Sequence, residues 1–506
     1  MLKSASSYTL HRPVLPFPLQ LDGRDGLAVY VQIARALAAD FTRGRLRPGD
    51  ALPGARSLAA SLGVHRNTVV AAYAELEAQG WISIDQGRRP RVVAPLTGSP
   101  RRFAAQAELR ACTPDEVGFA LPRREGTLLP PRPRAPLALW GGVPDARLLP
   151  REAIARAYRR RARRAGGDLW EYTPDPRGHP LLRRELAAMV SRGRGLAAGA
   201  DDVLVTRGSQ MAIALLADLL LVPGDVVAVE DPGYGPAWAA LRRTGAKLVP
   251  IPVDANGLRI DALEALLDRA PVRALYVTPH HQYPTTAMLS PSRRLELLEL
   301  ARKRRFAILE DDYDHEFHYD GRPVLPLASA DRHGVVVYIG SLSKILAPAL
   351  RLGFVVAPRP LIERLALRRA ALDRQGDQIL EASIADMLED GEIERHVRRA
   401  ARAYEARRDV LVAQLEDAFG DRLRFRTPSG GMAIWAQAAF DVEPWQRRAE
   451  AGGVFFQTGR SFTFDGSAPD VARFGFASRT EAELRRAVAI LASAAPPTDR
   501  ARSTRG

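Results

Sequence analysis

One lysine of this chain stands where its chemistry matters more than its charge. Lysine occurs at only four positions, 3, 247, 303 and 344, although lysine and arginine together number 73. Lys344 lies within GSLSK, directly after the apolar run VVVYI. Arginine would supply charge equally well, but only a neutral primary amine can attack a carbonyl carbon and form a Schiff base. We therefore expect Lys344 to be a nucleophile; the alternative is a lysine retained by chance on a loop.

Residues that can hold a phosphate lie close to other apolar runs. Ser209 and Gln210 follow VLVT and open an expected helix, whose free backbone N–H groups can bind an anion. Ser341 and Arg351 lie on either side of Lys344, and a hydroxyl and a guanidinium together can neutralise a phosphate. A Gly-Ser helix start is common by itself, so the prediction depends on the combination.

Residues suited to a flat, charged heterocycle follow two further runs. Asp311, Asp312 and Tyr313 come after FAILE, and Tyr234 comes after DVVAVE within DPGYGP. A carboxylate can bond a protonated ring nitrogen, a phenol can hold a ring hydroxyl, and a tyrosine can stack on the ring. Helix capping and surface packing are the alternatives for these residues taken singly. Pyridoxal 5'-phosphate needs all of these functions together, and we expect Asp311 rather than Asp312 to take the nitrogen.

These residues require a sheet to bring them together. Six apolar runs, VLVT, DVVAVE, ALYVTP, FAILE, VVVYIG and FVVAP, alternate with helical stretches between residues 137 and 495. Such alternation predicts an α/β domain with a mostly parallel sheet and helices on both faces. Residues that follow the strands would then meet at the carboxyl edge of the sheet.

Residues 20–94 predict a smaller, nucleic-acid-binding domain. Helical spacing is expected at 29–41 and 55–62, followed by a turn at Gly63 and a second helix that buries Val69, Ala72, Tyr73 and Leu76. Two helices around a tight turn, followed by the basic hairpin WISIDQGRRPRVV, are typical of a winged helix-turn-helix. The expected DNA contacts are Arg56, His65, Arg66, Asn67, Thr68, Arg88 and Arg89. A small helical docking module is the alternative.

Composition limits the remaining possibilities. The formal net charge of +15 favours an anionic partner such as double-stranded DNA. A single cysteine and the lack of a long uncharged apolar segment indicate a cytoplasmic protein without a membrane span. Residues 95–136, rich in Pro, Arg and Gly, read as a linker, and 496–506 as a disordered tail. We expect no metal site.

Residues 20–94 and residues 137–495 each resemble a known family. Leu52-Pro53, Leu62-Gly63-Val64, Ala72-Tyr73 and nearby residues resemble the winged helix of the GntR regulators, although the wing sequence GRRPRVV departs from the usual pattern. The segments EDPGY, EDDYDHEF, GSLSKILAPALRLGF and RFGFAS resemble the fold-type I aminotransferases. That resemblance implies the cofactor roles given above and adds Arg473 as a clamp for a substrate carboxylate, with a surface arginine as the alternative.

The two halves in this order resemble the MocR/GabR-type subgroup of the GntR family. The resemblance implies a transcriptional regulator that senses an amino compound or pyridoxal phosphate, and a head-to-tail homodimer with swapped winged helices. One departure concerns catalysis: His281-Gln282-Tyr283 precede Pro284, where aminotransferases have an asparagine, and Thr286 replaces a glycine. An active aminotransferase that carries a DNA-binding domain, and a repressor with an inert dimerisation scaffold, remain the rival hypotheses.

Overall fold

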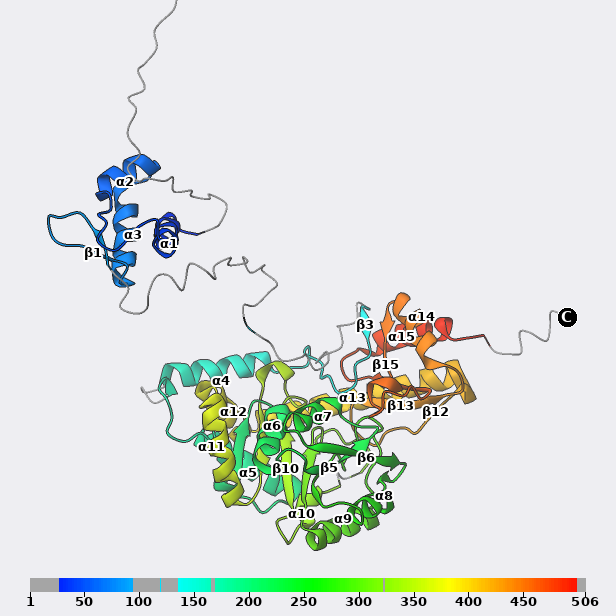
Figure 1. Cartoon of the computed structure of the whole chain (residues 1–506). Coiled ribbons are helices and arrows are strands. Elements are labelled where there is room, and N and C mark those ends of the chain that lie inside the picture. Colours follow the sequence, from blue (N-terminus) through cyan, green and yellow to red (C-terminus); the bar gives the residue numbers. More distant parts are fainter. Residues whose placement is uncertain (1–26, 94–118, 120–134, 165–168, 322–323, 498–506) are drawn as a thin grey trace, which may run out of the picture. The chain divides into compact units, whose positions relative to one another are not determined.

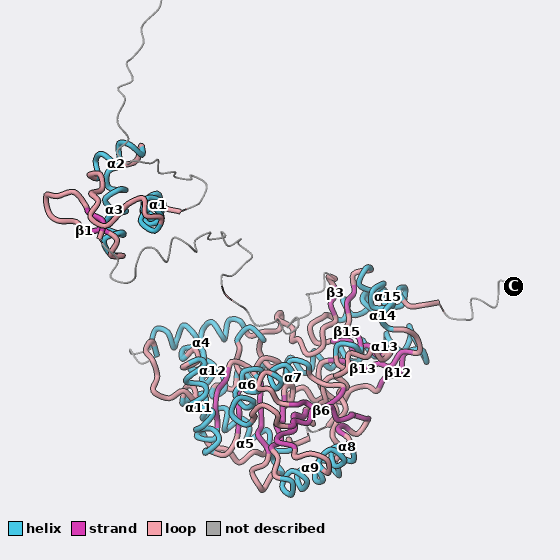
Figure 2. The backbone as a smooth tube through the Cα atoms, in the orientation of Figure 1, coloured by secondary structure: helices cyan, strands magenta, loops and turns pink. Residues whose placement is uncertain are grey.

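The chain forms two compact units, Met1–Leu128 and Leu129–Gly506. The computed structural model describes residues 27–93, 119, 135–164, 169–321 and 324–497 (Figures 1 and 2). We call the described part of the first unit, residues 27–93, the head, and residues 135–497 the large unit. Most of the expected linker, 95–136, and most of the expected tail, 496–506, lie outside the described residues, so those boundaries stay predictions.

The head has three helices and a hairpin. Its elements are α1 Val29–Thr42, α2 Ala55–Leu62, α3 Arg66–Ala78, β1 Ile82–Ser83 and β2 Arg91–Val92. Helix α2 ends at Gly63, whose φ of 67° is left-handed, as a tight turn into α3 requires. Helix α3 buries the expected stripe of Val69, Ala72, Tyr73 and Leu76 against α1 and α2. Strands β1 and β2 pair antiparallel and form the base of the expected wing.

An eight-stranded sheet forms the centre of the large unit. Its strands, in spatial order, are β4 Val203–Thr206, β11 Gly353–Val356, β10 Val336–Ser341, β9 Ala307–Asp312, β8 Val272–Val277, β5 Val226–Asp231, β6 Lys247–Asp254 and β7 Gly257–Leu258. Neighbouring pairs from β10 to β6 are parallel, whereas β11 and β7 run antiparallel to their neighbours. All six expected strands are present, and the mostly parallel α/β sheet is confirmed.

Helices cover both faces of this sheet, as its apolar strands require. Alternate residues of β10 show the division: Val337 and Ile339 pack with α6, α7 and α11, whereas Tyr338 packs with α4, α5 and α12. Helices α8 and α9 cover the remaining part of the second face. The helices are α4 Arg151–Arg164, α5 Pro180–Arg194, α6 Ser209–Leu220, α7 Gly235–Arg242, α8 Ile260–Leu267, α9 Pro291–Arg304, α10 Leu327–Ala330, α11 Arg359–Asp373 and α12 Gln378–Glu389.

A second, antiparallel sheet follows in the chain. Its order is β12 Leu423–Phe425, β13 Ala433–Ala438, β16 Val471–Gly475 and β15 Gln457–Thr458. Helices α13 Glu392–Phe419, α14 Val442–Ala451 and α15 Glu481–Ala494 pack on it around the buried Trp445. The short strands β3 Leu137–Ala138 and β14 Val454–Phe455 pair beside it. The six apolar runs of the sequence do not include the strands of this layer, which carries Arg473 on β16.

Candidate functional site

The eight residues expected to bind a cofactor all line one cavity. It has a volume of about 250 Å³ and lies at the carboxyl ends of β8, β9 and β10, as the sheet topology requires. A water molecule occupies roughly 30 Å³ in the liquid, so the cavity has room for a ring-sized molecule. The expected residues in its lining are Ser209, Gln210, Tyr234, Asp311, Tyr313, Ser341, Lys344 and Arg351.

Lys344 lies just after β10, and its amine reaches the cavity. Burial lowers the pKa of this amine; the positive charges of Arg473 and Arg351 act in the same direction, while the carboxylates of Asp314 and Asp311 oppose it. Among the described residues the amine has no hydrogen-bond partner. A lowered pKa increases the fraction of neutral amine, which is the form that can attack a carbonyl carbon.

The two adjacent aspartates have separate environments because successive residues of a strand point to opposite faces. Asp311 lines the cavity; its Oδ2 accepts a hydrogen bond of 2.7 Å from the Tyr276 hydroxyl, and its Oδ1 is buried without a partner. Burial raises the pKa of Asp311 to about 7. Asp312 Oδ2 instead accepts from the Tyr338 hydroxyl at 2.8 Å and lies 3.1 Å from His315 Nδ1. This geometry favours Asp311 for the ring nitrogen, although that role stays a prediction.

One end of the cavity is suited to an anion. Ser209 and Gln210 form the first turn of α6, where backbone N–H groups lack helical partners. The Arg351 guanidinium donates to the carbonyl of Arg207 at 2.8 Å and lies over Gly208. A Cβ atom at position 208 would come within 3.1–3.2 Å of that guanidinium. Ser341, at the end of β10, accepts a 3.2 Å hydrogen bond from the backbone of Ser343. These groups surround a space suited to a phosphate.

Three tyrosines form an aromatic wall. Tyr234 and Tyr283 meet edge to face with ring centroids 5.1 Å apart, and Tyr313 lies 6.0 Å from Tyr283. The Tyr313 hydroxyl donates to the carbonyl of His281 at 3.0 Å. Because a phenol has a single proton, Tyr313 can donate to a ring oxygen only if its hydrogen bond to the His281 carbonyl breaks.

Arg473 lies behind the cavity rather than in its lining. It is 1% exposed, its Nε donates to the carbonyl of Pro284 at 3.1 Å, and its Nη1 is buried without a partner. The guanidinium carbon lies 4.5 Å from the centre of the Tyr283 ring. It also fills the space beside Gly141, where a Cβ atom would overlap it. The alternative of a surface arginine is therefore wrong, whereas the carboxylate-clamp role stays a prediction.

The loop that departs from the aminotransferase pattern is fixed by its own hydrogen bonds. The Gln282 amide donates to the carbonyls of Tyr283 and of Pro232, which directly follows β5, and it accepts from Thr285, so its hydrogen-bonding groups are all used. Thr286 adopts a φ of 61°, a conformation that a glycine would enter without strain. Tyr283, directly before Pro284, faces the cavity where the usual pattern has an asparagine.

Sequence reasoning missed part of the lining. Tyr276, Thr278 and Ser343 face the cavity, as do Gly141 and Gly142 near the start of the large unit. The residue just after β8, Thr278, could have been found by the strand-end argument that identified Tyr234 and Asp311. Nothing in the sequence pattern near residue 141 indicates that a segment so distant in the chain returns to this sheet edge.

The expected DNA contacts lie on the exposed surface of the head. Arg66 and Asn67 form the first turn of α3 with Thr68, and His65 precedes them as the helix cap, its Nδ1 accepting from the Asn67 backbone at 3.2 Å. His65, Arg66 and Asn67 are exposed, Thr68 is half-buried, and Arg56, Arg88 and Arg89 are exposed. The next arginine of the hairpin, Arg91, lies in β2 and donates to the Gly49 carbonyl at 2.9 Å. These contacts stay predictions.

Among the residues that the structure describes, no helix has the length and apolar character needed to cross a membrane.

Family models match both units. Residues 29–92 match the GntR family of bacterial regulatory proteins, and residues 143–491 match aminotransferase class I and II. Two solved enzymes share the fold of the large unit. The α-aminoadipate aminotransferase LysN of Thermus thermophilus, complexed with N-(5'-phosphopyridoxyl)-L-leucine, is 28% identical with a TM-score of 0.66, covering 71% of this chain and 91% of that one. A kynurenine aminotransferase of Pyrococcus horikoshii gives the same identity and TM-score, with 71% and 90% covered.

Curated relatives match along both units. The probable rhizopine catabolism regulatory protein MocR of Rhizobium meliloti is 31% identical over 499 residues, covering 96% of this chain and 98% of that protein. The transcriptional regulator TauR of Rhodobacter capsulatus is 34% identical over 462 residues, covering 89% and 92%. With a GntR head followed by an aminotransferase-type unit, and with such coverage of MocR and TauR, the chain belongs to the MocR-type subgroup of the GntR family of transcriptional regulators.

Proposed function

We propose that this regulator holds pyridoxal 5'-phosphate in the cavity at Lys344 and changes its DNA binding when an amino compound, or the cofactor itself, occupies that cavity. The observation that carries the proposal is the convergence of an amine, a carboxylate, three tyrosines and an anion site on one space of about 250 Å³. LysN, with which the large unit shares its fold, is described in a complex with a phosphopyridoxyl compound.

The side chains fit this cofactor at both of its ends. Asp311 Oδ1 is buried without a partner, and a protonated ring nitrogen would supply the donor that it lacks. The start of α6 and the Arg351 guanidinium can share the negative charge of a phosphate.

The residues of the chain would each perform one task. When bound, the cofactor supplies an aldehyde and an electron-poor ring. The Lys344 amine, whose pKa burial lowers, would hold the cofactor covalently at its aldehyde carbon, with the aldehyde oxygen leaving as water. Asp311 would keep a proton on the ring nitrogen, Tyr234 would pack against the ring, and Tyr313 would donate to the ring oxygen once its bond to the His281 carbonyl opens.

Arg473 would bind the carboxylate of an amino-acid effector. Its Nη1 is buried without a partner and lies next to Gly141, which lines the cavity. Effector binding can change DNA affinity only if the effector binds two arrangements of the protein with different free energy. We further propose a cytoplasmic homodimer in which the head of one chain lies against the large unit of the other, so that two heads reach two half-sites.

A spectroscopic experiment tests the cofactor site. Purified protein mixed with pyridoxal 5'-phosphate should gain a visible absorption band, and borohydride reduction should attach the cofactor's mass to the peptide that contains Lys344. Lys344→Ala should abolish both signals. Lys303→Ala is the matched control, because Lys303 is an exposed lysine paired with Glu299 on α9. Retention of the band in Lys344→Ala, or mass on another lysine, would refute the assignment.

A footprint tests the regulatory step. The protein should protect a DNA site upstream of its own gene, and the protection should change when the cofactor or an amino compound is added. If the absorption band forms but DNA affinity is indifferent to every amino compound and to the cofactor, the site binds the cofactor without regulating.

The second candidate function is an active aminotransferase. It is favoured by the fold shared with LysN and by the position of Arg473, which adds its positive charge near Lys344. Tyr283 argues against efficient turnover, because it faces the cavity before Pro284 in place of the usual asparagine. Multiple turnovers between an amino acid and a keto acid at ordinary enzyme rates would support this candidate.

A further inference from the structure

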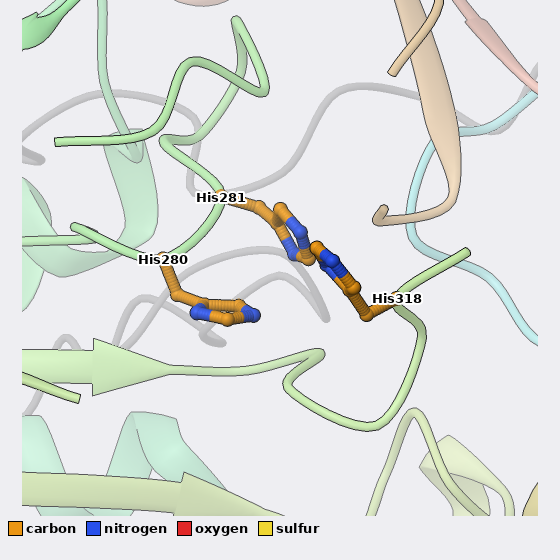
Figure 3. A group of neighbouring side chains, drawn as sticks. All are labelled: His280, His281 and His318. Atoms are coloured by element: carbon orange, nitrogen blue, oxygen red, sulfur yellow. The ribbon is translucent and has the colours of Figure 1, made fainter. Parts of the chain in front are cut away.

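Four of the nine histidines in the chain lie together beside the cavity. His280 and His281 follow β8, and His315 and His318 follow β9, the parallel neighbour of β8. The His280 ring centroid is 4.3 Å from that of His281, 4.7 Å from that of His315 and 6.2 Å from that of His318. Figure 3 shows the rings of His280, His281 and His318 gathered around one space.

In two of these rings, hydrogen bonds determine which nitrogen carries the proton and which carries the free lone pair. His281 Nδ1 lies 2.8 Å from Asp314 Oδ1, and a carboxylate oxygen accepts, so the proton is on Nδ1 and the lone pair on Nε2. His318 Nε2 lies 2.6 Å from the carbonyl oxygen of Asp320, so its proton is on Nε2 and its lone pair on Nδ1. Both lone-pair nitrogens are buried without a hydrogen-bond partner.

His280 completes the group. It is 1% exposed, and both of its ring nitrogens are buried without a partner. A neutral imidazole has one donor and one acceptor, so His280 also holds an unused lone pair in this space. Leaving several buried polar atoms unpaired destabilises a fold, and such a group calls for an explanation.

We propose that His280, His281 and His318 bind a divalent transition metal ion, with Zn²⁺ as the best match. One nitrogen from each ring lies within 4.8 Å of the others. Nitrogens that share a tetrahedral Zn²⁺ at about 2.0–2.1 Å stand roughly 3.3 Å apart, so modest side-chain rotations close the site. Imidazole nitrogen suits Zn²⁺ better than it suits Mg²⁺ or Ca²⁺.

The surroundings have the features of a metal site. The Asp314–His281 pair has the arrangement in which a carboxylate orients a metal-binding imidazole. A water molecule could take the fourth position; the His315 ring lies 4.7 Å from the His280 ring between centroids, and its Nε2 is also buried without a partner. Gly430 leaves room for the His281 ring, since a Cβ atom there would lie 2.3 Å from Nε2.

The ion would join two segments that form one wall of the cavity. His281 lies two residues before Tyr283, and Asp314 directly follows Tyr313; both tyrosines line the cavity. The Tyr313 hydroxyl already donates to the His281 carbonyl. We therefore assign the ion a structural role: it holds the segment after β8 against the segment after β9. This assignment does not depend on whether the cavity binds a cofactor.

Metal analysis of the untagged, full-length protein tests the site. After dialysis against metal-free buffer, we expect one equivalent of Zn²⁺ per chain, and competition with a chromogenic chelator should give its affinity. His318→Gln and His280→Gln should lose the stoichiometric ion, and Asp314→Asn should weaken binding by about 10–100-fold. His333→Gln is the matched control, because His333 is an exposed histidine of the same unit, and it should keep the ion.

Stability gives a second readout. Added Zn²⁺ should raise the melting temperature of the metal-free wild type and of His333→Gln, but not that of His318→Gln. His318 is only half-buried, so this variant keeps the test decisive if His280→Gln fails to fold. The proposal is overturned if the wild type binds neither Zn²⁺ nor Co²⁺ with measurable affinity, or if the histidine variants retain the ion as well as the control does.

Discussion

Asp311 and Asp312 show how adjacent residues of one type acquire opposite properties. Burial raises the pKa of Asp311 to about 7, whereas the pKa of Asp312 lies well below its ordinary value: burial would raise it, but the nearby His315, His280 and Arg194 outweigh that effect. The sequence indicates that both lie at the end of a strand but does not determine which one faces the cavity. The alternation of side chains along β9 decides this, and it depends on the register with β8 and β10.

The raised pKa of Asp311 predicts a pH effect on the cofactor-free protein. Between pH 4 and pH 7 the folded state binds the proton more tightly than the unfolded chain does, so this group's contribution to stability falls as pH rises through that window. Asp311→Asn should remove this loss, which amounts to at most about 1.4 kcal/mol per pH unit. Melting temperatures of wild type and variant, measured from pH 4.5 to 7.5, should converge at the acid end and diverge at the other.

Asp312→Asn is the control, because Asp312 affects the pH dependence of stability in the opposite direction. The folded state lowers the pKa of Asp312, so its contribution is present above its ordinary pKa of 3.8 and is lost as pH falls. The variant should therefore be destabilised across the neutral range because it disrupts the contacts with Tyr338 and His315. Identical pH profiles for the two variants would contradict the division of roles.

Elements whose sequences are continuous apolar runs were predictable, and short or distant ones were not. Buried parallel strands such as β9 and β10 are apolar on both faces, which makes them visible in the sequence. Strands β12 and β15 have only three and two residues, too few to show a period. The histidine cluster escaped notice because its two pairs become neighbours only when β8 and β9 pair.

The start of α6 carries a prediction about anion binding. Gly208 has a φ of 76°, and a Cβ atom there would press on the Arg351 guanidinium. Gly208→Ala should therefore weaken binding of pyridoxal 5'-phosphate, measured by calorimetry, by roughly tenfold or more, which corresponds to about 1.4 kcal/mol. Gly224→Ala separates strain from contact, because Gly224 has a φ of 93° with nothing within 4 Å of the added atom. Equal losses of pyridoxal 5'-phosphate affinity in the two variants would show that backbone strain alone weakens binding, without the contact on Arg351.

At the scale of the whole molecule, the sequence predicted two domains of different chemistry, and the division between them at Leu128 and Leu129 lies within the expected linker. The winged helix-turn-helix head and the aminotransferase-type unit are both confirmed by their family matches. The expected dimer remains a prediction, since it concerns a second chain.

DNA binding by the head should respond differently to two kinds of substitution. Arg66→Ala, in the first turn of α3, should cost about 1–3 kcal/mol on the specific site and relax base preference there. Replacing Arg88 and Arg89 together by alanine should weaken binding to all sequences and lower the salt dependence by about one unit per lost phosphate contact. Titrations at several salt concentrations measure both effects, with Arg486→Ala on α15 as a charge-matched control.

The head's buried cluster has a consequence for how such regulators arise. Its described members lie between Ile33 and Val92, within the head itself. A head with an interior of its own can be exchanged for another without disturbing the core of the large unit. Chimeras that join this head to a different sensor should thus keep its operator preference, and recombination at the connecting segment offers a short evolutionary route to new regulatory circuits.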